Sequence, residues 1–475
     1  MRNNSNFIKE NLERRTFGEH LTSKDIFLKC IFPEIKENLH EYIWVDFFAG
    51  EGNLILPILN NIPKQKRIDF FENHIYLFDV QEKMVEMCVK NAELYGIPTK
   101  LAKDRIKARD NLETFPEFLK VKDFPLFHVT NPPYLYLGYI RKHKETQKYL
   151  KYFQGANNGY QDLYQIAMIN DLRNEVKNLI YIIPTNFIFG ASVSNKFRID
   201  FLKYYNISKM ILFETKEFEF TGQNICIGFF KRKNSSEGDI VNFKALKIKQ
   251  NNELLDKLFV LKRKYKYRGG TQFFEFLDEY KTKKPLNVKY YLLSEEVTKN
   301  KGTNQISVID SNNYANNEYK RIPISVNNNL REKIENNILY VQTVDKGSSE
   351  GRVGLGIIAQ DFKVKGIFVS SSPYRTHPIQ IFLTPQISKE EQILLKDYFN
   401  FILEHFRKEL DSEFLTTYKY SKAEYTRKYL GLTQVRNLIE TLPITNMDKL
   451  SKENLKEAIF NGDFKKILNI INENK

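Results

Sequence analysis

The tetrapeptide Asn131-Pro132-Pro133-Tyr134 directly follows the apolar segment Pro125–Thr130 and contains groups that can activate an aromatic amine. Two consecutive prolines fix the backbone and remove two N–H donors, which leaves the carbonyl groups free to accept. The Asn131 side-chain oxygen and the Pro132 carbonyl can then converge on one amino group and localise its lone pair for attack. The Tyr134 ring offers a face on which a base can stack. The alternative interpretation is an Asn-capped turn with two structural prolines.

A second pattern, Val45-Asp46-Phe47-Phe48-Ala49-Gly50-Glu51-Gly52-Asn53, ends one apolar segment and opens a helical one. Gly50 and Gly52 allow the backbone to approach a ligand closely. Ile55 replaces the third glycine of the dinucleotide fingerprint, which disfavours pyrophosphate binding. Asp79 ends the next expected strand, where a carboxylate can accept from both ribose hydroxyls. Capping of the following helix is the other interpretation of Asp79.

A third candidate is Asp110, which lies where a further strand is expected to end. A carboxylate there can accept a hydrogen bond from an adenine amino group. Taken alone, Asp110 is no better supported than any surface aspartate, and Asp104 competes with it.

These candidates follow short segments that are apolar on both faces, which is typical of buried parallel strands. The expected strands are Ile43–Phe48, Ile75–Val80, Pro125–Thr130 and Leu179–Pro184. Helical patterns lie between them, at Gln81–Tyr95 and Gln161–Val176. This alternation predicts a doubly wound, mostly parallel α/β sheet, closed by the strands Lys209–Thr215 and Ile225–Lys233.

The segment Asn234–Gly238 resembles a linker, so we predict one domain over residues 1–235 and a second, α+β domain over 236–475. In the second half we expect loops at Asn312–Asn317 and Asn327–Asn329, short strands within Gly351–Thr384, and helices at Lys389–Leu410 and Ser451–Ile471. The basic and aromatic run Leu261–Arg268 is either a phosphate contact or a solvated face.

Composition restricts the class of protein. The chain has 475 residues, a formal net charge of +15 and a pI near 9.2, which favours a polyanionic partner such as nucleic acid. Residues 1–235 hold 34 basic and 28 acidic side chains, and the remainder 39 and 30, so the excess is spread out. Three separated cysteines give neither a disulfide framework nor a metal knuckle, and we expect a cytoplasmic protein without a bound metal.

The order of these motifs resembles that of adenine-N6 DNA methyltransferases of the gamma class, the class of the TaqI methylase. The resemblance rests on Arg15–Thr22, the Gly-x-Gly turn, Asp79, Asp110 and Asn-Pro-Pro-Tyr, and it covers about Arg15 to Lys233. It implies a Rossmann-like class I methyltransferase domain that uses S-adenosylmethionine and releases S-adenosylhomocysteine. It also implies that the second domain recognises the target in double-stranded DNA.

The resemblance assigns roles to individual residues. Those expected to bind the cofactor are Thr22, Asp46, Ala49, Gly50, Gly52, Asp79 and Asp110, although Phe47 stands where the family usually has proline. Asp162-Leu163-Tyr164 is similar to a helix start beside the cofactor. Asn131, Pro132 and Tyr134 are the expected catalytic residues. Phe220, favoured over Phe218 because of its spacing to the strand at Ile225, is expected to stack with Tyr134 on a flipped adenine; an ordinary core aromatic is the alternative.

The mechanism expected from this resemblance needs no general base, so His128 is interpreted as a buried structural residue. Ser371-Ser372-Pro373-Tyr374 is interpreted as a turn. Too few residues precede Arg15 for a nuclease domain, so we expect a separate cognate restriction endonuclease as the functional partner. Three alternatives stay open: a protein-glutamine methyltransferase, an rRNA base methyltransferase, and a DNA-binding specificity protein without catalysis.

Overall fold

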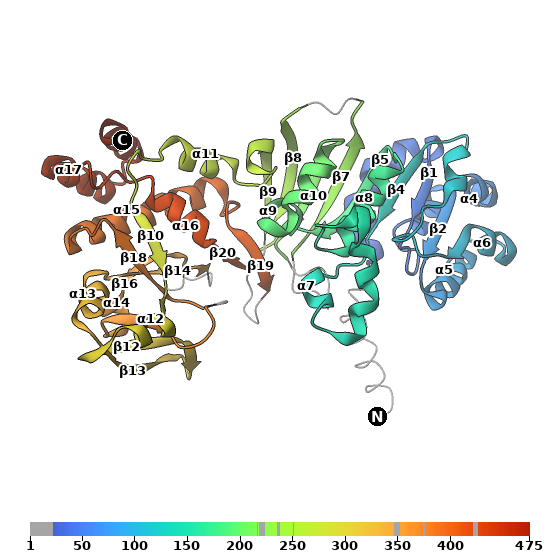
Figure 1. The fold of residues 1–475 in the computed structure, drawn as a ribbon. Coiled ribbons are helices and arrows are strands. Elements are labelled where there is room, and N and C mark those ends of the chain that lie inside the picture. The colour runs from blue at the N-terminus through green and yellow to red at the C-terminus, as the bar shows by residue number, and fades with distance from the viewer. Residues whose placement is uncertain are drawn as a thin grey trace. The chain divides into compact units, whose positions relative to one another are not determined.

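The computed structural model describes residues 22–215, 217, 224–234, 238–249, 251–345, 352–373, 376–420 and 426–475. The chain divides into two compact units (Figure 1). The first consists of Met1–Gly269 with Lys419–Thr426, and the second of Gly270–Tyr418 with Arg427–Lys475.

A nine-stranded sheet forms the centre of the first unit, in the order β3-β2-β1-β4-β5-β7-β6-β8-β9 (Figure 1). Strands β1 to β5 run parallel to one another, whereas β7 is antiparallel to both of its neighbours. The bounds are β1 Ile43–Asp46, β2 Ile75–Asp79, β3 Ile106–Ala108, β4 Leu126–Thr130, β5 Asn178–Pro184, β6 Tyr205–Phe213, β7 Ile225–Arg232, β8 Ile240–Ile248 and β9 Leu254–Lys262. The predicted doubly wound, mostly parallel sheet is confirmed.

Both faces of the central strands are buried, as their continuous apolar sequence predicts. In β1, Trp44 packs in one hydrophobic cluster, and Ile43 and Val45 pack in another on the opposite face. In β2, Leu77 packs in the same cluster as Trp44, and Tyr76 packs in the cluster on the opposite face. Helices of this unit are α2 Lys24–Ile26, α3 Phe32–Ile35, α4 Arg67–His74, α5 Glu82–Leu94, α6 Thr99–Arg105, α7 Leu137–Ile140, α8 Leu163–Arg173, α9 Asn186–Phe189 and α10 Ser192–Leu202.

The first unit extends beyond the linker expected after Ser235. Strand β8 pairs in parallel with β6, and β9 pairs with β8, so both belong to the same sheet. The rings of Phe243 and Phe259 stack at 5.1 Å and join the core. The boundary between the units therefore falls at Gly269, because composition at a loop does not reveal whether the strand after it returns to the sheet.

The second unit has α+β architecture. Its sheets have the orders β10-β18-β14-β16, β11-β17-β12-β13 and β15-β20-β19. Strand bounds are β10 Asn287–Tyr290, β11 Leu292–Leu293, β12 Lys301–Ala315, β13 Glu318–Val326, β14 Leu339–Gln342, β15 Val344–Asp345, β16 Gly354–Ile357, β17 Gly366–Val369, β18 Ile379–Thr384, β19 Thr416–Tyr420 and β20 Thr426–Tyr429. Helix bounds are α11 Thr271–Glu279, α12 Ser294–Lys299, α13 Asn328–Asn336, α14 Ile358–Phe362, α15 Lys389–Leu410, α16 Leu432–Ile439, α17 Lys449–Phe460 and α18 Phe464–Asn474.

Two predicted elements of this unit differ in outcome. The helix Lys389–Leu410 is confirmed as α15, and a capping box between Ser388 and Glu391 begins it. The helix expected over Ser451–Ile471 is two helices, α17 and α18, because Gly462 adopts a φ of 71° that ends the first.

A buried polar network fixes the strands beneath the candidate site. His128 of β4 and Asp171 of α8 are 0% and 1% exposed, and the His128 Nδ1 lies 2.6 Å from the Asp171 Oδ2. The Tyr181 hydroxyl of β5 donates to the same oxygen at 2.6 Å. The His128 Nε2 accepts from the Phe47 N–H at 3.2 Å. His128 is therefore structural, as expected, and it holds the backbone that leaves β1.

We expect Tyr181→Phe to lower the free energy of unfolding by about 1.5–3 kcal/mol, because a hydrogen bond to a buried carboxylate is lost. Urea denaturation followed by circular dichroism measures this change. Tyr136→Phe, at a 42% exposed ring, is the matched control and should be near neutral. Equal effects of the two substitutions would contradict the assigned role of the network.

Candidate functional site

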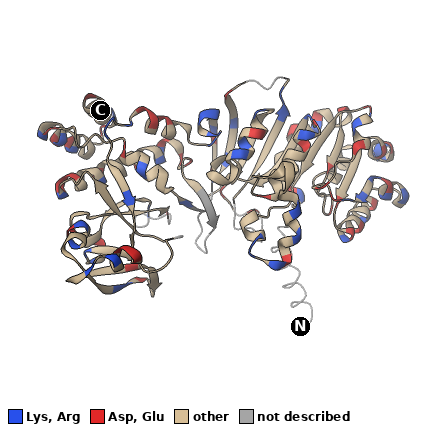
Figure 2. Ribbon diagram, in the orientation of Figure 1, with Lys and Arg blue, Asp and Glu red and all other residues tan. Residues whose placement is uncertain are grey.

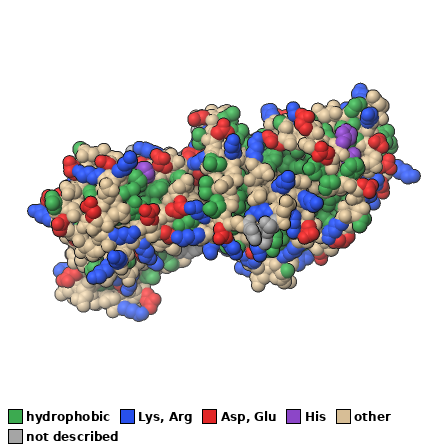
Figure 3. All heavy atoms as spheres, turned by 90° about the horizontal axis from the view of Figure 1, so that it is seen from above, with side chains coloured by type: hydrophobic (Ala, Val, Ile, Leu, Met, Phe, Trp, Pro, Cys, Tyr) green, Lys and Arg blue, Asp and Glu red, His purple; other side chains and the backbone are tan. Residues whose placement is uncertain are grey.

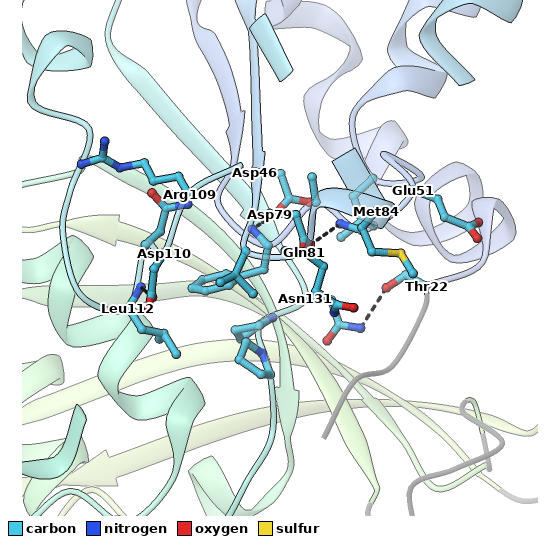
Figure 4. Close-up of a pocket in the computed structure, with 18 of the residues that line it drawn as sticks. Thr22, Asp46, Glu51, Asp79, Gln81, Met84, Arg109, Asp110, Leu112 and Asn131 are labelled. Atoms are coloured by element: carbon cyan, nitrogen blue, oxygen red, sulfur yellow. Dashed lines mark hydrogen bonds between the residues drawn. The ribbon is translucent and has the colours of Figure 1, made fainter. Parts of the chain in front are cut away.

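A cavity of about 510 Å³ opens in the first unit at the carboxyl ends of β1, β2, β3 and β4 (Figure 4). Parallel pairing brings these strand ends to one edge of the sheet, the usual place of a ligand site in such folds. The sequence-predicted residues that line it are Thr22, Asp46, Ala49, Gly50, Asp79, Asp110, Asn131 and Pro132.

The loop after β1 is held by side chains and by one backbone hydrogen bond to β2, from the Ala49 N–H to the Phe78 carbonyl at 2.8 Å. The Asp46 Oδ1 accepts from the Phe48 N–H at 2.9 Å and from the Thr130 hydroxyl at 2.5 Å. The Asn111 Nδ2 donates to the Phe47 carbonyl at 3.0 Å. Asp46 is 1% exposed, and this burial raises its pKa to about 6. The loop is thus fixed before any ligand enters.

Asp79 joins the glycine loop to the next helix. Its Oδ2 accepts from the Gly50 N–H at 2.9 Å, and its Oδ1 accepts from the Gln81 N–H at 2.9 Å. Burial raises the Asp79 pKa, and these backbone donors oppose the shift. Asp79 precedes Gln81, the N-cap residue of α5, so it does not cap this helix as the alternative interpretation supposed. Each carboxylate oxygen can accept a second hydrogen bond from a ligand.

Asp110 lines the cavity, and its competitor Asp104 does not. The Asp110 Oδ1 accepts from the Leu112 N–H at 3.1 Å, and its Oδ2 accepts from the Tyr152 hydroxyl at 2.5 Å. Asp104 instead forms an ion pair with Lys107 at 3.6 Å on the surface. The structure therefore favours Asp110 over Asp104 as a ligand contact.

The Asn131 amide is held at both of its ends. Its Nδ2 donates to the Thr22 hydroxyl at 2.9 Å (Figure 4), and its Oδ1 accepts from the Tyr134 hydroxyl. The Pro132 that follows also lines the cavity. An amide bound in this way has little rotational freedom, so its carbonyl is already oriented for an incoming N–H.

Tyr134 lies behind this amide rather than in the cavity lining. It is 7% exposed, and its hydroxyl oxygen also lies 2.6 Å from the Ile182 carbonyl, so the Asn131 Oδ1 and this carbonyl share its single proton. Stacking of a base on Tyr134 therefore stays a prediction. Phe220 lies outside the described residues, and its stacking role stays a prediction too. Gly52 is not a lining residue, but its φ of 80° shapes the loop.

Sequence reasoning missed a wall of the cavity contributed by the 3₁₀ helix η6, Lys144–Phe153. This helix contributes Lys148, Tyr149, Lys151 and Tyr152 to the lining. The repeated Lys-Tyr pairs in this segment were an available signal. Phe48 and Met84, which also line the cavity, carry no distinguishing pattern in the sequence.

The cavity contains four carboxylates, and it can attract a cationic ligand. They are Asp46, Glu51, Asp79 and Asp110, and the basic lining residues are Arg109, Lys148 and Lys151. Among the described residues, no cluster of three or more His, Cys, Asp or Glu side chains could hold a metal ion. In the same part of the chain, no helix is long and apolar enough to cross a membrane.

The sequence matches the model of the N-6 DNA Methylase family over residues 8–318. The chain therefore belongs to this family of N-6 DNA methylases. No curated protein gives a significant sequence match.

Restriction-modification proteins are among the solved structures that this chain resembles. The type IIL restriction-modification enzyme MmeI in complex with DNA is 12% identical with a TM-score of 0.53, and the match covers 97% of this chain and 75% of that one. A modification subunit of a type I restriction enzyme from Vibrio vulnificus YJ016 is 12% identical with a TM-score of 0.36, over 71% of this chain. The chain spans 58% of the length of that subunit. It spans 36% of the matched chain in a cryoEM structure of a DrdV–DNA complex.

The glycine loop allows a test of close packing. A Cβ on Gly52 would lie 2.6 Å from the Leu56 Cδ1 and 2.7 Å from the Cys88 Sγ, whereas one on Gly96 would meet nothing within 4 Å. Both glycines have positive φ, so the backbone strain in Gly52→Ala and Gly96→Ala is comparable. We expect Gly52→Ala to cost about 1–3 kcal/mol more in unfolding free energy, because its neighbours must move. Thermal denaturation of both variants tests this, and equal losses would contradict it.

Asp162 supports the residues after the tetrapeptide. It precedes α8, and its Oδ1 accepts from the Leu135 N–H at 2.9 Å. Burial raises its pKa from 3.8 to about 7, against the backbone N–H groups that lower it. Between these two values the folded protein binds a proton that the unfolded chain releases, so this site loses its stabilising contribution as the pH rises toward 7.

We therefore expect the stability of the wild type, relative to Asp162→Asn, to rise by about 2 kcal/mol when the pH is lowered from about 8 to about 5.5. Urea denaturation at the two pH values measures this. Asp448→Asn is the control and should show no change over this range, because hydrogen bonds from Ser451 lower the Asp448 pKa below 3.8 and this carboxyl stays ionised at both pH values. The same pH dependence in wild type and Asp162→Asn would exclude this proton uptake.

Proposed function

We propose that the protein is an adenine-N6 DNA methyltransferase of the gamma class that uses S-adenosylmethionine. Its membership of the N-6 DNA methylase family supports the chemistry. The principal observation is that Asn131 and Pro132 line the same cavity as Gly50 and Asp79. A ligand held on the glycine loop would therefore lie beside the acceptors that grip a target amine.

The residues present fit S-adenosylmethionine. The cavity volume of about 510 Å³ suits a small ligand, and its four carboxylates suit one that bears a sulfonium and an ammonium group. Asp79 would accept from the ribose hydroxyls, and Asp110 from the adenine amino group. Thr22 and Asp46 would lie toward the methionine part, with Ala49 and Gly50 against it.

S-Adenosylmethionine, when bound, supplies an activated methyl group on positively charged sulfur. The Asn131 Oδ1 and the Pro132 carbonyl accept from the two N6–H groups of the target adenine, which localises the nitrogen lone pair. Thr22 and Tyr134 hold the Asn131 amide in place during the reaction. The excess proton leaves the methylated amine for water after transfer, so no side chain needs to act as a base. Most of the rate enhancement comes from orientation.

The target adenine has to leave the DNA stack to reach Asn131, at a cost of a few kcal/mol. Hydrogen bonds to Asn131 and Pro132, with stacking on Tyr134 and Phe220, offset this cost. Because the Tyr134 ring is buried without substrate, it must be uncovered when the base enters.

Double-stranded DNA is the proposed partner. The net charge of +15 fits a polyanion, and basic side chains are spread over both units (Figure 2) and along the face seen in Figure 3. In the run Leu261–Arg268, Tyr267 and Arg268 are buried and only Arg263, Lys264 and Lys266 are exposed, so half of it serves the fold. MmeI, which shares the fold, was solved with DNA. We further propose a cytoplasmic role that protects host DNA from a cognate restriction endonuclease.

Asn131→Ala should lower methyl transfer to duplex DNA by about a hundredfold or more, as loss of one preorganised polar contact does at other active sites. Binding of S-adenosylmethionine should change little, since the glycine loop and Asp79 are untouched. Radiolabelled methyl transfer measures the first quantity and isothermal titration calorimetry the second.

Asn73→Ala, on the exposed surface of α4, is the control and should retain full activity. Ribosomal RNA and a protein-glutamine acceptor are offered in parallel, because methyltransferases for these two substrates are the alternatives that the sequence leaves open. Methylation of either in preference to DNA would overturn the proposal, as would near-normal turnover by Asn131→Ala. DNA binding without binding of S-adenosylmethionine would favour a non-catalytic specificity protein.

A further inference from the structure

The hairpin of β12 and β13 extends beyond the sheet to which it belongs. Strand β12 pairs with β17 only at Val308, Ile309 and Asp310, after which it pairs with β13 alone. The pairs Tyr314–Tyr319 and Ala315–Glu318 continue this two-stranded ribbon to its tip. The turn residues Asn316 and Asn317 have φ values of 51° and 64°, as expected for a tight hairpin turn.

One face of this ribbon is anchored. The Tyr319 ring lies 4.6 Å from that of Tyr314 and 5.9 Å from that of Phe362, and its hydroxyl donates to the His377 carbonyl at 2.7 Å. The Asn312 amide donates to the Ser372 carbonyl at 2.9 Å and accepts from the Ser371 N–H at 3.0 Å. These contacts hold the ribbon rigidly against the second unit. They also show that the Ser371-Ser372 segment has a structural role.

The opposite face is polar and open. Side chains alternate along a strand, so Ala315 and Lys320 lie on the opposite face from the tyrosines. Glu318, at the tip, also borders the cavity that Tyr314 and Tyr319 line. Glu318 and Lys320 are exposed. Asn313, in the irregular stretch of β12, is exposed too. Amide, carboxylate and ammonium groups therefore lie close together on a narrow support.

We propose that this open face enters the major groove of the target DNA and reads base edges, an inference that rests on the proposed function. The major groove is wide enough for a two-stranded ribbon. Asn pairs with adenine, Lys with guanine, and a carboxylate with the cytosine amino group. Glu318, Lys320 and Asn313 present these three groups. The aromatic anchor on the other face fixes them, and fixed side chains discriminate between bases.

Protection of a sheet edge is the competing explanation, because β13 is an edge strand and charged side chains discourage edge pairing. To protect the edge, a charged side chain of either sign at any position along β13 is sufficient. It does not need the ribbon to extend past the sheet or to be anchored by Tyr319. It also predicts that removal of Lys320 leaves sequence preference unchanged.

The first test compares methylated sequences. Lys320→Ala and Glu318→Ala are expressed with a plasmid of known sequence, and methylated adenines are mapped by sequencing. We expect discrimination at one base position of the recognised site to fall roughly tenfold, so that additional sequences are methylated. Lys301→Ala, at the exposed start of β12, removes the same charge away from the tip and should leave the recognised sequence unchanged.

The second test needs no activity. The substitution Asn313→p-benzoylphenylalanine should crosslink to duplex DNA under ultraviolet light, and Glu453→p-benzoylphenylalanine on α17 should not. Methylation of the same sequence by wild type and both tip variants, or absence of the Asn313 crosslink, would overturn the inference and leave the proposed function standing. Crosslinking without methylation by the wild type would overturn the proposed function instead.

Discussion

Parallel pairing of β1 with β2 and with β4 is the constraint on which the site depends. Parallel strands end at the same edge of a sheet, so the loops that follow them meet there without any further device. Asp46, Asp79 and Asn131 are far apart in the sequence and line one cavity for this reason. The continuous apolar sequence of the strands is in turn what buries both faces of the sheet.

Preorganisation runs through the whole site. The Phe47 carbonyl and N–H are satisfied by Asn111 and His128, and the Gly50 N–H by Asp79. The Ala49 N–H also donates to the Phe78 carbonyl of β2 at 2.8 Å, so the backbone leaves β1 in one defined conformation. Hydrogen bonds also fix the Asn131 amide, whose nitrogen donates to Thr22 and whose oxygen accepts from Tyr134. Polar groups fixed before binding lose little entropy when a ligand arrives.

The sequence patterns of the first unit predict its strands more accurately than those of the second unit. In the first, buried parallel strands have a strong apolar signal, and the bounds of β2 and β4 follow it within a residue or two. In the second, β12 and β13 are half exposed, and their Asn-rich end was expected to be a loop. Asn tolerates positive φ, so the same residues that suggest a loop also make a tight hairpin turn.

The sequence by itself determined the parallel α/β sheet, the order of the motifs along it and eight of the residues that line the cavity. These follow from local apolar patterns and from short motifs at strand ends, which depend on nearby residues alone. Only the tertiary structure decided that β8 and β9 extend the first unit, that η6 supplies Lys148 and Tyr152, and that Tyr134 lies behind Asn131. Each of these depends on contacts between segments distant in the chain, and such contacts leave no local pattern by which to recognise them.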